Sequence, residues 1–213
     1  MPIAWNDDPP GSSPRIESNL RAVLATLVAD APTRVTPTIS MAQDWHRAIY
    51  SGVALPVPYY AGEIRDTNPA FPELIGYEVM VGSAFGVGSA DVPDALRAFE
   101  AGMAAMTTQL DTRLAVGARP ADPVDLRAVL IAAAIAHGEW IRIHPFANGN
   151  GRTARLWANW VGLRYGLPPF VSLRPRPDGL LHAGAAAASM RGDHGPMVTA
   201  LLDMLSATLR EPP

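Results

Sequence analysis

Twelve consecutive residues, 144–155, concentrate the side chains in this chain that could do chemistry. They read His-Pro-Phe-Ala-Asn-Gly-Asn-Gly-Arg-Thr-Ala-Arg. Pro145 disfavours the helical conformation for His144, so the histidine is expected at the end of a helix rather than inside one. Gly149 and Gly151 allow a tight turn that brings backbone N–H groups close to a ligand. A histidine beside such a loop has the chemistry of a general base.

The loop leads into a helix expected to begin near Arg152, and the N-terminus of a helix favours an anion. Arg152 and Arg155 lie three residues apart, so both guanidinium groups can project near that helix end. Guanidinium groups match the geometry of phosphate oxygens. The segment therefore indicates attack of a hydroxyl on a phosphoryl group, with His144 as the base and the arginines holding the developing charge.

Residues 149–154 also fit the dinucleotide-binding pattern with a final alanine. That pattern requires a preceding strand and an acidic residue about 20 positions later. A helix is expected before this segment, and no acid occurs between Arg152 and Pro177. The chain also lacks the Walker-type phosphate loop and the zinc-protease pattern. His137 lies seven residues before the loop histidine, but the proline that ends the helix argues against a metal-binding pair.

The elements that must position this loop are mostly helical. Pro- and Gly-rich residues 55–93 include an alternating stretch that predicts a β-hairpin at about 74–90. Ser40 is the expected N-cap of the second helix. The fold class expected is mostly α, a helical bundle with a small β-hairpin. Apolar periodicity predicts helices over 14–30, 40–50, 94–108, 123–143, 152–165, 178–189 and 196–209.

Length and composition fit a single globular domain. The chain has 213 residues, 48% of them apolar and 17% charged, and residues 1–13 are expected to form a tail before a domain at 14–213. The net charge of −3 gives no electrostatic reason to expect a nucleic-acid partner. Cysteine is absent, which excludes disulfides, thiolate metal sites and cysteine nucleophiles.

The longest apolar run, residues 128–136, is too short to cross a bilayer. The N-terminus lacks the basic-then-apolar order of a signal peptide. A cytoplasmic protein without a membrane partner is the expectation, although an effector exported by a signal-free route would look the same. The oligomeric state is left open, a homodimer included.

The twelve residues resemble the signature of the Fic family (Fic/DOC-like protein adenylyltransferases). That signature is His-Pro-Phe, any residue, an acid, Gly-Asn-Gly-Arg, two further residues and Arg. The resemblance implies a Fic-type helical bundle that transfers AMP from ATP to a Ser, Thr or Tyr hydroxyl of a target protein. It covers about 14–209, because further residues are similar: Trp45-His46, His137, Trp140, Gly192-Asp193 and Pro196.

The resemblance also implies roles for individual residues. The hairpin would be a flap that docks an extended segment of the target by strand addition. Mg²⁺ or Mn²⁺ would accompany ATP. The positions of the family map onto His144 as the general base, Gly149, Asn150 and Gly151 as an anion cradle, Arg152 as a phosphate ligand and Arg155 as the ligand of the γ-phosphate.

One position departs from the family. Asn148 stands where the family usually has the Asp or Glu that binds Mg²⁺. An amide oxygen is a hard ligand but carries no charge, so Asn148 is expected to bind metal weakly. The triphosphate would then supply most of the metal ligands.

Residues 13–18 resemble a second motif of many Fic proteins: Ser or Thr, three residues, Glu, then Gly or Asn. Ser13 and Glu17 fit, and Ser18 departs at the last position. The resemblance implies that Glu17, on an inhibitory helix at 14–30, pairs with Arg155 and blocks the γ-phosphate. Otherwise Glu17 is a first-turn acid that the helix dipole favours.

Two other functions fit the same residues. One is a de-AMPylating enzyme, in which Glu17 would position a water. The other is a non-catalytic nucleotide-binding regulator, motivated by the missing acid at Asn148. The target protein, its modified residue and the base of the nucleotide are left open.

Overall fold

The computed structural model describes residues 3–177 and 180–210. Over these residues the fold is mostly α with one two-stranded hairpin, as the sequence predicts. None of the described helices is both long and apolar enough to traverse a bilayer. Residues 178–179, expected to begin the sixth helix, lie outside the described residues. The elements are α1 (Ser13–Asp30), α2 (Ile39–Ile49), β1 (Met80–Val81), β2 (Ala84–Phe85), α3 (Val92–Asp111), α4 (Pro123–Ile143), α5 (Asn150–Arg164), α6 (Leu180–Ser189) and α7 (Gly195–Thr208).

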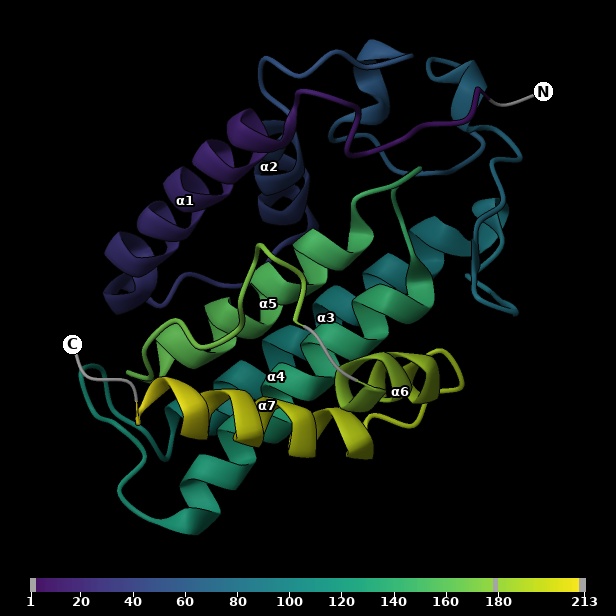
Figure 1. Cartoon of the computed structure of the whole chain (residues 1–213). Helices are drawn as coiled ribbons and strands as arrows, with labels where there is room; N and C mark the ends of the chain where they lie inside the picture. Colours follow the sequence, from purple (N-terminus) through teal and green to yellow (C-terminus); the bar gives the residue numbers. More distant parts are fainter. Residues whose placement is uncertain (1–2, 178–179, 211–213) are drawn as a thin grey trace.

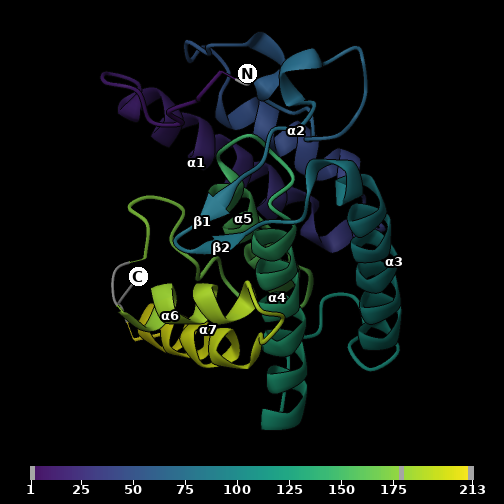
Figure 2. The same ribbon diagram turned by 90° about the vertical axis from the view of Figure 1, so that its right-hand side faces the viewer.

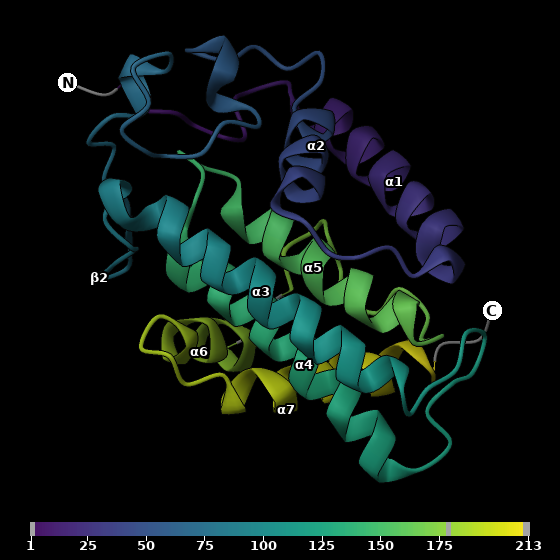
Figure 3. The same cartoon turned by 180° about the vertical axis from the view of Figure 1, so that it is seen from behind.

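Helices α4 and α5 form the centre of the molecule. They pack against each other, and α3, α6 and α7 pack around α4 (Figure 1; Figure 3). Trp140 of α4 and Trp157 of α5 are fully buried, with ring centroids 5.9 Å apart. Phe99 of α3 contacts both rings edge-on, at 5.5 and 5.3 Å. These large apolar rings hold the two helices that flank the loop of residues 144–149 in fixed positions.

A second layer consists of α1 and α2, which cover α5 (Figure 1). The buried side of α1 is formed by Ile16, Leu20, Val23 and Leu27, the helical spacing seen in the sequence. The N-cap of α2 is Thr38, whose hydroxyl accepts a hydrogen bond from the N–H of Met41, and not the expected Ser40. Thr38 has the extended backbone that a capping residue needs, whereas Ser40 already lies inside the helix.

The hairpin stands beside the start of α5, between the α1–α2 layer and helices α6 and α7 (Figure 2). In its register Met80 faces Phe85 and Val81 faces Ala84. Gly82 begins the two-residue turn with a φ of 62°, which glycine adopts without strain. The N–H of the residue at position 87 donates to a main-chain carbonyl of α4 at 3.3 Å, so the hairpin is tied to the end of that helix.

Candidate active site

His144 caps the C-terminal end of α4 in the left-handed conformation, with φ of 53° and ψ of 57°. Its Nδ1 lies 3.0 Å from the carbonyl oxygen of Ile141. Because a carbonyl only accepts, Nδ1 carries the proton and Nε2 keeps a free lone pair. Burial, helped by the nearby charge of Arg65, lowers the pKa of His144 to about 4. At neutral pH the imidazole is therefore uncharged, with Nε2 ready to accept a proton.

The loop after His144 is fixed by contacts with α2. Phe146 is fully buried and stacks on His46 of α2 at 3.8 Å between ring centroids. His46 accepts from the N–H of Gly62 at 2.9 Å, so its other nitrogen donates to the carbonyl of Asn148 at 3.0 Å. The side-chain amide of Asn150 donates to and accepts from the backbone of Phe146, both at 2.9 Å. Asn150 therefore pins the loop with its side chain and does not cap the helix.

The first turn of α5 presents free backbone donors to the loop. Gly149 has a φ of 76°, and a Cβ there would lie 2.4 Å from the hydroxyl of Tyr50, so only glycine fits. Helix α5 begins at Asn150, and the N–H groups of Asn150 and Gly151 have no hydrogen-bond partner among the described residues. Both residues line the same cavity as His144. Orphan amides of this kind are where helices bind anions.

Arg152 and Arg155 are both at least nine-tenths buried. Arg152 donates to the hydroxyl of Tyr50 at 2.7 Å and pairs with Asp7. Arg155 donates one hydrogen bond, to a main-chain carbonyl at 3.1 Å, and its Nε has no partner among the described residues. Burial, with the charges of Arg152 and Arg176, lowers the pKa of Arg155 to about 10. A buried cation this short of acceptors is suited to receive an anionic ligand.

These groups share one cavity of about 670 Å³. The described lining includes four arginines and two aspartates, a positive balance that favours a polyphosphate. The site residues predicted within 144–155 all line the cavity, and the β1 side of the hairpin forms part of its wall. The lining includes His144, Asn148, Gly149, Asn150, Gly151, Arg152 and Arg155 from the loop and α5, Met80, Val81 and Gly82 from the hairpin, Asp7 and Asp8 from the N-terminal segment, and Arg174 and Arg176 after α5.

The predicted pairing of Glu17 with Arg155 is wrong for this structure. Glu17 pairs instead with Arg21, one turn along α1, at 2.5 Å, and its side chain is 47% exposed. Glu17 lines a separate cavity of about 460 Å³. The reason is helical geometry, because Ile16 and Leu20 turn toward the core and their neighbour Glu17 projects away from it. Of the predicted inhibitory pair, Ser13 alone approaches the site, accepting a hydrogen bond from Arg174 at 2.7 Å.

Arg65 is a site residue that the sequence did not reveal, because it lies in the irregular stretch before the hairpin. Its side chain is fully buried and joins the hairpin to the loop. One charged group satisfied by several main-chain carbonyls fixes the relative position of all of them. Its guanidinium donates to the carbonyls of His144 (2.8 Å), Ile143 (3.1 Å), Tyr77 (2.8 Å) and Val87 (2.8 Å), and its N–H donates to that of Pro145 (2.7 Å).

If His144 is the general base that the motif implies, Arg65→Gln should lower the rate of the reaction roughly 10- to 100-fold, because a small displacement of the base is costly. Loss of the positive charge should also raise the pKa of His144. The base works only when neutral, so the acid limb of the pH–rate profile should move to higher pH. Rates at saturating substrate, measured from about pH 3 to about pH 7 so that the range brackets the lowered pKa of about 4, test this. Arg65→Lys keeps the charge, so it should lower the rate without moving the acid limb of the pH–rate profile. If the acid limb stays in place in both variants, Arg65 has only a structural role.

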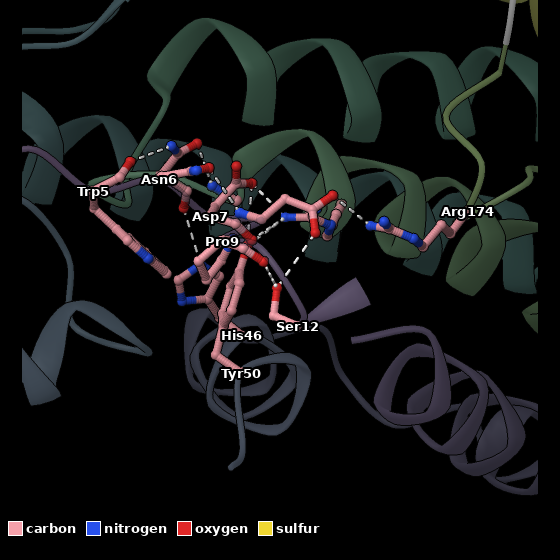
Figure 4. Close-up of polar contacts among 12 residues, drawn as sticks. Trp5, Asn6, Asp7, Pro9, Ser12, His46, Tyr50 and Arg174 are labelled. Carbon is pink, nitrogen blue, oxygen red and sulfur yellow. Dashed lines mark hydrogen bonds and ion pairs between the residues drawn. The ribbon is translucent and has the colours of Figure 1, made fainter. Parts of the chain in front are cut away.

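The N-terminal segment, residues 5–12, was expected to be part of a tail and instead packs against the site, with Asp7 and Asp8 in the lining of the cavity. Figure 4 shows it between Arg174 on one side and His46 and Tyr50 on the other. Trp5 is 5% exposed and meets the ring of Tyr50 edge-on at 4.7 Å. The carboxylate of Asp7 pairs with Arg152. No local pattern marks these residues, because their partners lie far along the chain.

Asn148, the expected weak metal ligand, already uses both ends of its amide. Its oxygen accepts from the N–H of Gly149 and its nitrogen donates to the carbonyl of Trp5, each at 2.8 Å. In the described part of the chain, no group of three or more His, Asp or Glu residues is arranged to hold a metal ion.

The sequence profile of the Fic/DOC family matches residues 37–161, more than half of the chain. The chain belongs to the Fic/DOC family. The profile spans α2 to α5 and so includes the hairpin, the loop and both arginines of the Fic motif. The family assignment and the helical fold predicted from the sequence are thus confirmed.

Relatives of this Fic protein include the protein adenylyltransferase Fic of Drosophila virilis, 38% identical over 77 residues. That match covers 36% of this chain and 16% of the relative, and a match to the protein adenylyltransferase fic-1 of Caenorhabditis elegans covers 8% of that relative, so the chain aligns with only a small part of the length of these curated relatives. Among solved structures, the N-terminal Fic domain of Bep8 from Bartonella sp. 1-1C has a TM-score of 0.63 at 16% identity, covering 100% of this chain and 94% of that one. BepC of Bartonella tribocorum, solved with bound AMPPNP, has a TM-score of 0.59 at 16% identity, covering 96% and 92%. These similarities show the fold.

Proposed function

We propose that this Fic protein is a protein adenylyltransferase that moves AMP from ATP to a Ser, Thr or Tyr hydroxyl of another protein. One observation carries the proposal. The neutral imidazole of His144, the orphan amides of Asn150 and Gly151, and the buried guanidinium of Arg155 line a single cavity. The partial similarity to proteins named adenylyltransferases supports the same reaction.

In this reaction the hydroxyl proton of the target passes to Nε2 of His144 while the hydroxyl oxygen bonds to the α-phosphorus. The bond from that phosphorus to the oxygen bridging to the β-phosphate breaks, and pyrophosphate leaves. The amides of Asn150 and Gly151 hold the phosphate oxygens, while Arg152 and Arg155 hold the leaving group. His144 then loses its proton to solvent and is ready for another turnover.

ATP is proposed to enter as its Mg²⁺ or Mn²⁺ complex, with the triphosphate supplying most of the metal ligands. The engaged amide of Asn148 supports this, because it leaves the protein without a carboxylate at that point. A crystal soaked with a non-hydrolysable ATP analogue and Mg²⁺ tests the arrangement. The α-phosphate is expected on the amides of Asn150 and Gly151, facing Nε2 of His144. A nucleotide bound outside this cavity would contradict it.

The hairpin is proposed to dock an extended segment of the target along the free edge of β1. The pair of residues 79 and 86 is hydrogen-bonded at 3.1 Å, so by alternation the next pair, Met80 and Phe85, points its backbone groups outward. Met80 and the two residues that follow it line the cavity. A strand paired with β1 would therefore pass the mouth of the cavity and carry its hydroxyl toward His144.

Met80→Pro removes one outward-facing donor, and we expect it to lower target modification about five- to tenfold, the effect of one lost hydrogen bond. ATP affinity should not change. Phe85→Pro removes the equivalent donor on the opposite edge of the hairpin and is the matched control. Label transferred from ATP to lysate proteins measures both. Equal losses in the two variants would show that the target does not pair with β1.

The de-AMPylating alternative loses the residue that motivated it, because Glu17 lies outside the cavity. The regulator alternative still has the missing acid at Asn148 in its favour. It predicts nucleotide binding without any covalent product, so mass spectrometry of the protein and of lysate targets after incubation with ATP separates it from the enzyme.

A further inference from the structure

The N-terminal segment, residues 5–12, is held beside the cavity by the buried side chain of Trp5. Trp5 is buried among aromatic rings, lying 4.7 Å from the ring of Tyr50 and 5.9 Å from that of Tyr60. The hydroxyl of Tyr60 donates to the carbonyl of Ile3 at 2.9 Å. A buried tryptophan is a strong anchor for an otherwise irregular segment. It brings Asp7 and Asp8 into the lining of the cavity, where Asp7 (Figure 4) pairs with Arg152 of α5.

The two carboxylates occupy the cations that a polyphosphate needs. Arg152 donates to the carboxylate and the carbonyl of Asp7, the latter at 3.2 Å. Asp8 lies 3.6 Å from Arg152 and pairs with Arg174 at 2.9 Å. Ser13 also donates to Asp8, at 3.1 Å. A carboxylate and a phosphate compete for the same guanidinium edge, so Arg152 cannot hold both in full.

Asn148 links the segment to the loop. Its side-chain nitrogen donates to the carbonyl of Trp5 at 2.8 Å. An aspartate at this position would offer only acceptors to that carbonyl, and its charge would face Asp7 and Asp8. Asn148, the residue that departs from the Fic motif, is thus the residue whose side-chain donor holds the N-terminal segment against the loop.

We propose that residues 5–12 act as an intramolecular anion that competes with nucleotide for Arg152, and that Asn148 is the latch that holds them in place. This inference rests on the proposed nucleotide site and adds its regulation. ATP binds only when the segment lifts from Arg152, and any partner that takes up the segment around Trp5 raises the activity.

The test compares the affinity for ATP, with Mg²⁺, of the wild type and of Asp7→Asn/Asp8→Asn by calorimetry. A segment docked in about 90% of molecules weakens the apparent affinity about tenfold, so the variant should bind ATP about tenfold more tightly. Asp30→Asn/Asp203→Asn makes the same charge change at two exposed positions and should keep the wild-type affinity. Equal or weaker binding by the Asp7/Asp8 variant, with the wild type binding ATP, would overturn the inference and leave the proposed function standing.

Hydrogen exchange of residues 5–12 gives a readout independent of affinity. Saturating ATP should speed exchange of these amides in the wild type, and Asn148→Asp should speed it without any nucleotide. Slower or unchanged exchange with ATP means that the segment stays in the occupied site, which contradicts displacement. Unchanged exchange in Asn148→Asp would show that Asn148 does not hold the segment in place. If no variant binds ATP, the proposed function fails and the inference fails with it.

Discussion

Replacing His144 is expected to lower AMP transfer by about 10²- to 10⁴-fold while leaving ATP affinity nearly unchanged, which is the effect of losing a general base. The reason lies in the tautomer: Ile141 accepts the proton of Nδ1, so Nε2 alone is free to act. Asparagine is the better replacement, because His144 has a positive φ that Asn tolerates and alanine does not. Asn also keeps a donor for the carbonyl of Ile141.

The measurement is the initial rate of AMP incorporation at saturating ATP, with ATP affinity determined separately. His194→Gln is a matched control, because this histidine pairs with Glu139 at 2.7 Å and is not part of the cavity lining. Transfer by His144→Asn at more than about a tenth of the wild-type rate would mean that another group takes the proton.

Replacing Arg155 by methionine is expected to weaken ATP binding by about tenfold or more, while the melting temperature stays within a few degrees of the wild type or rises. Arg155 is 6% exposed and makes one hydrogen bond to the described residues. Its pKa is lowered to about 10, chiefly by burial, so the charged form is poorly compensated until an anion arrives. A methionine of similar length removes that uncompensated charge and keeps most of the packing.

Calorimetry with ATP and thermal unfolding measure the two effects together. Arg191→Met removes an arginine that is exposed on the protein surface and should change neither quantity much. A large fall in melting temperature combined with unchanged ATP affinity would show that Arg155 stabilises the fold and does not bind the nucleotide. The opposite pattern is the mark of a functional residue that is held at a cost to stability.

The sequence predicted the central helices well because their signals are local. The apolar run and the two prolines around residues 123–143 gave both ends of α4 correctly. The site residues within 144–155 could also be predicted from local signals, because Pro and Gly mark where the helix before the loop ends and the next one begins. The structure brings His144, the loop amides and both arginines of α5 into one cavity, as the motif implied.

The predictions that failed depended on which side of an element faces the site. Glu17 had a suitable position in the chain, but the buried stripe of α1 directs it to Arg21. Arg65 and Asp7 had no sequence signal, because their contacts with the site reach far along the chain: Arg65 donates to Ile143, 78 positions away, and Asp7 pairs with Arg152, 145 positions away. Contacts of this kind depend on how distant segments pack, which composition and periodicity do not specify.

The most direct test of the proposed reaction is to incubate the wild-type protein and target lysate with ATP labelled at either the α- or the γ-phosphate. The account predicts that protein acquires α-label, that γ-label is released in pyrophosphate, and that His144→Asn incorporates neither. Incorporation of γ-label, or α-label that persists in His144→Asn, would contradict AMP transfer by this histidine.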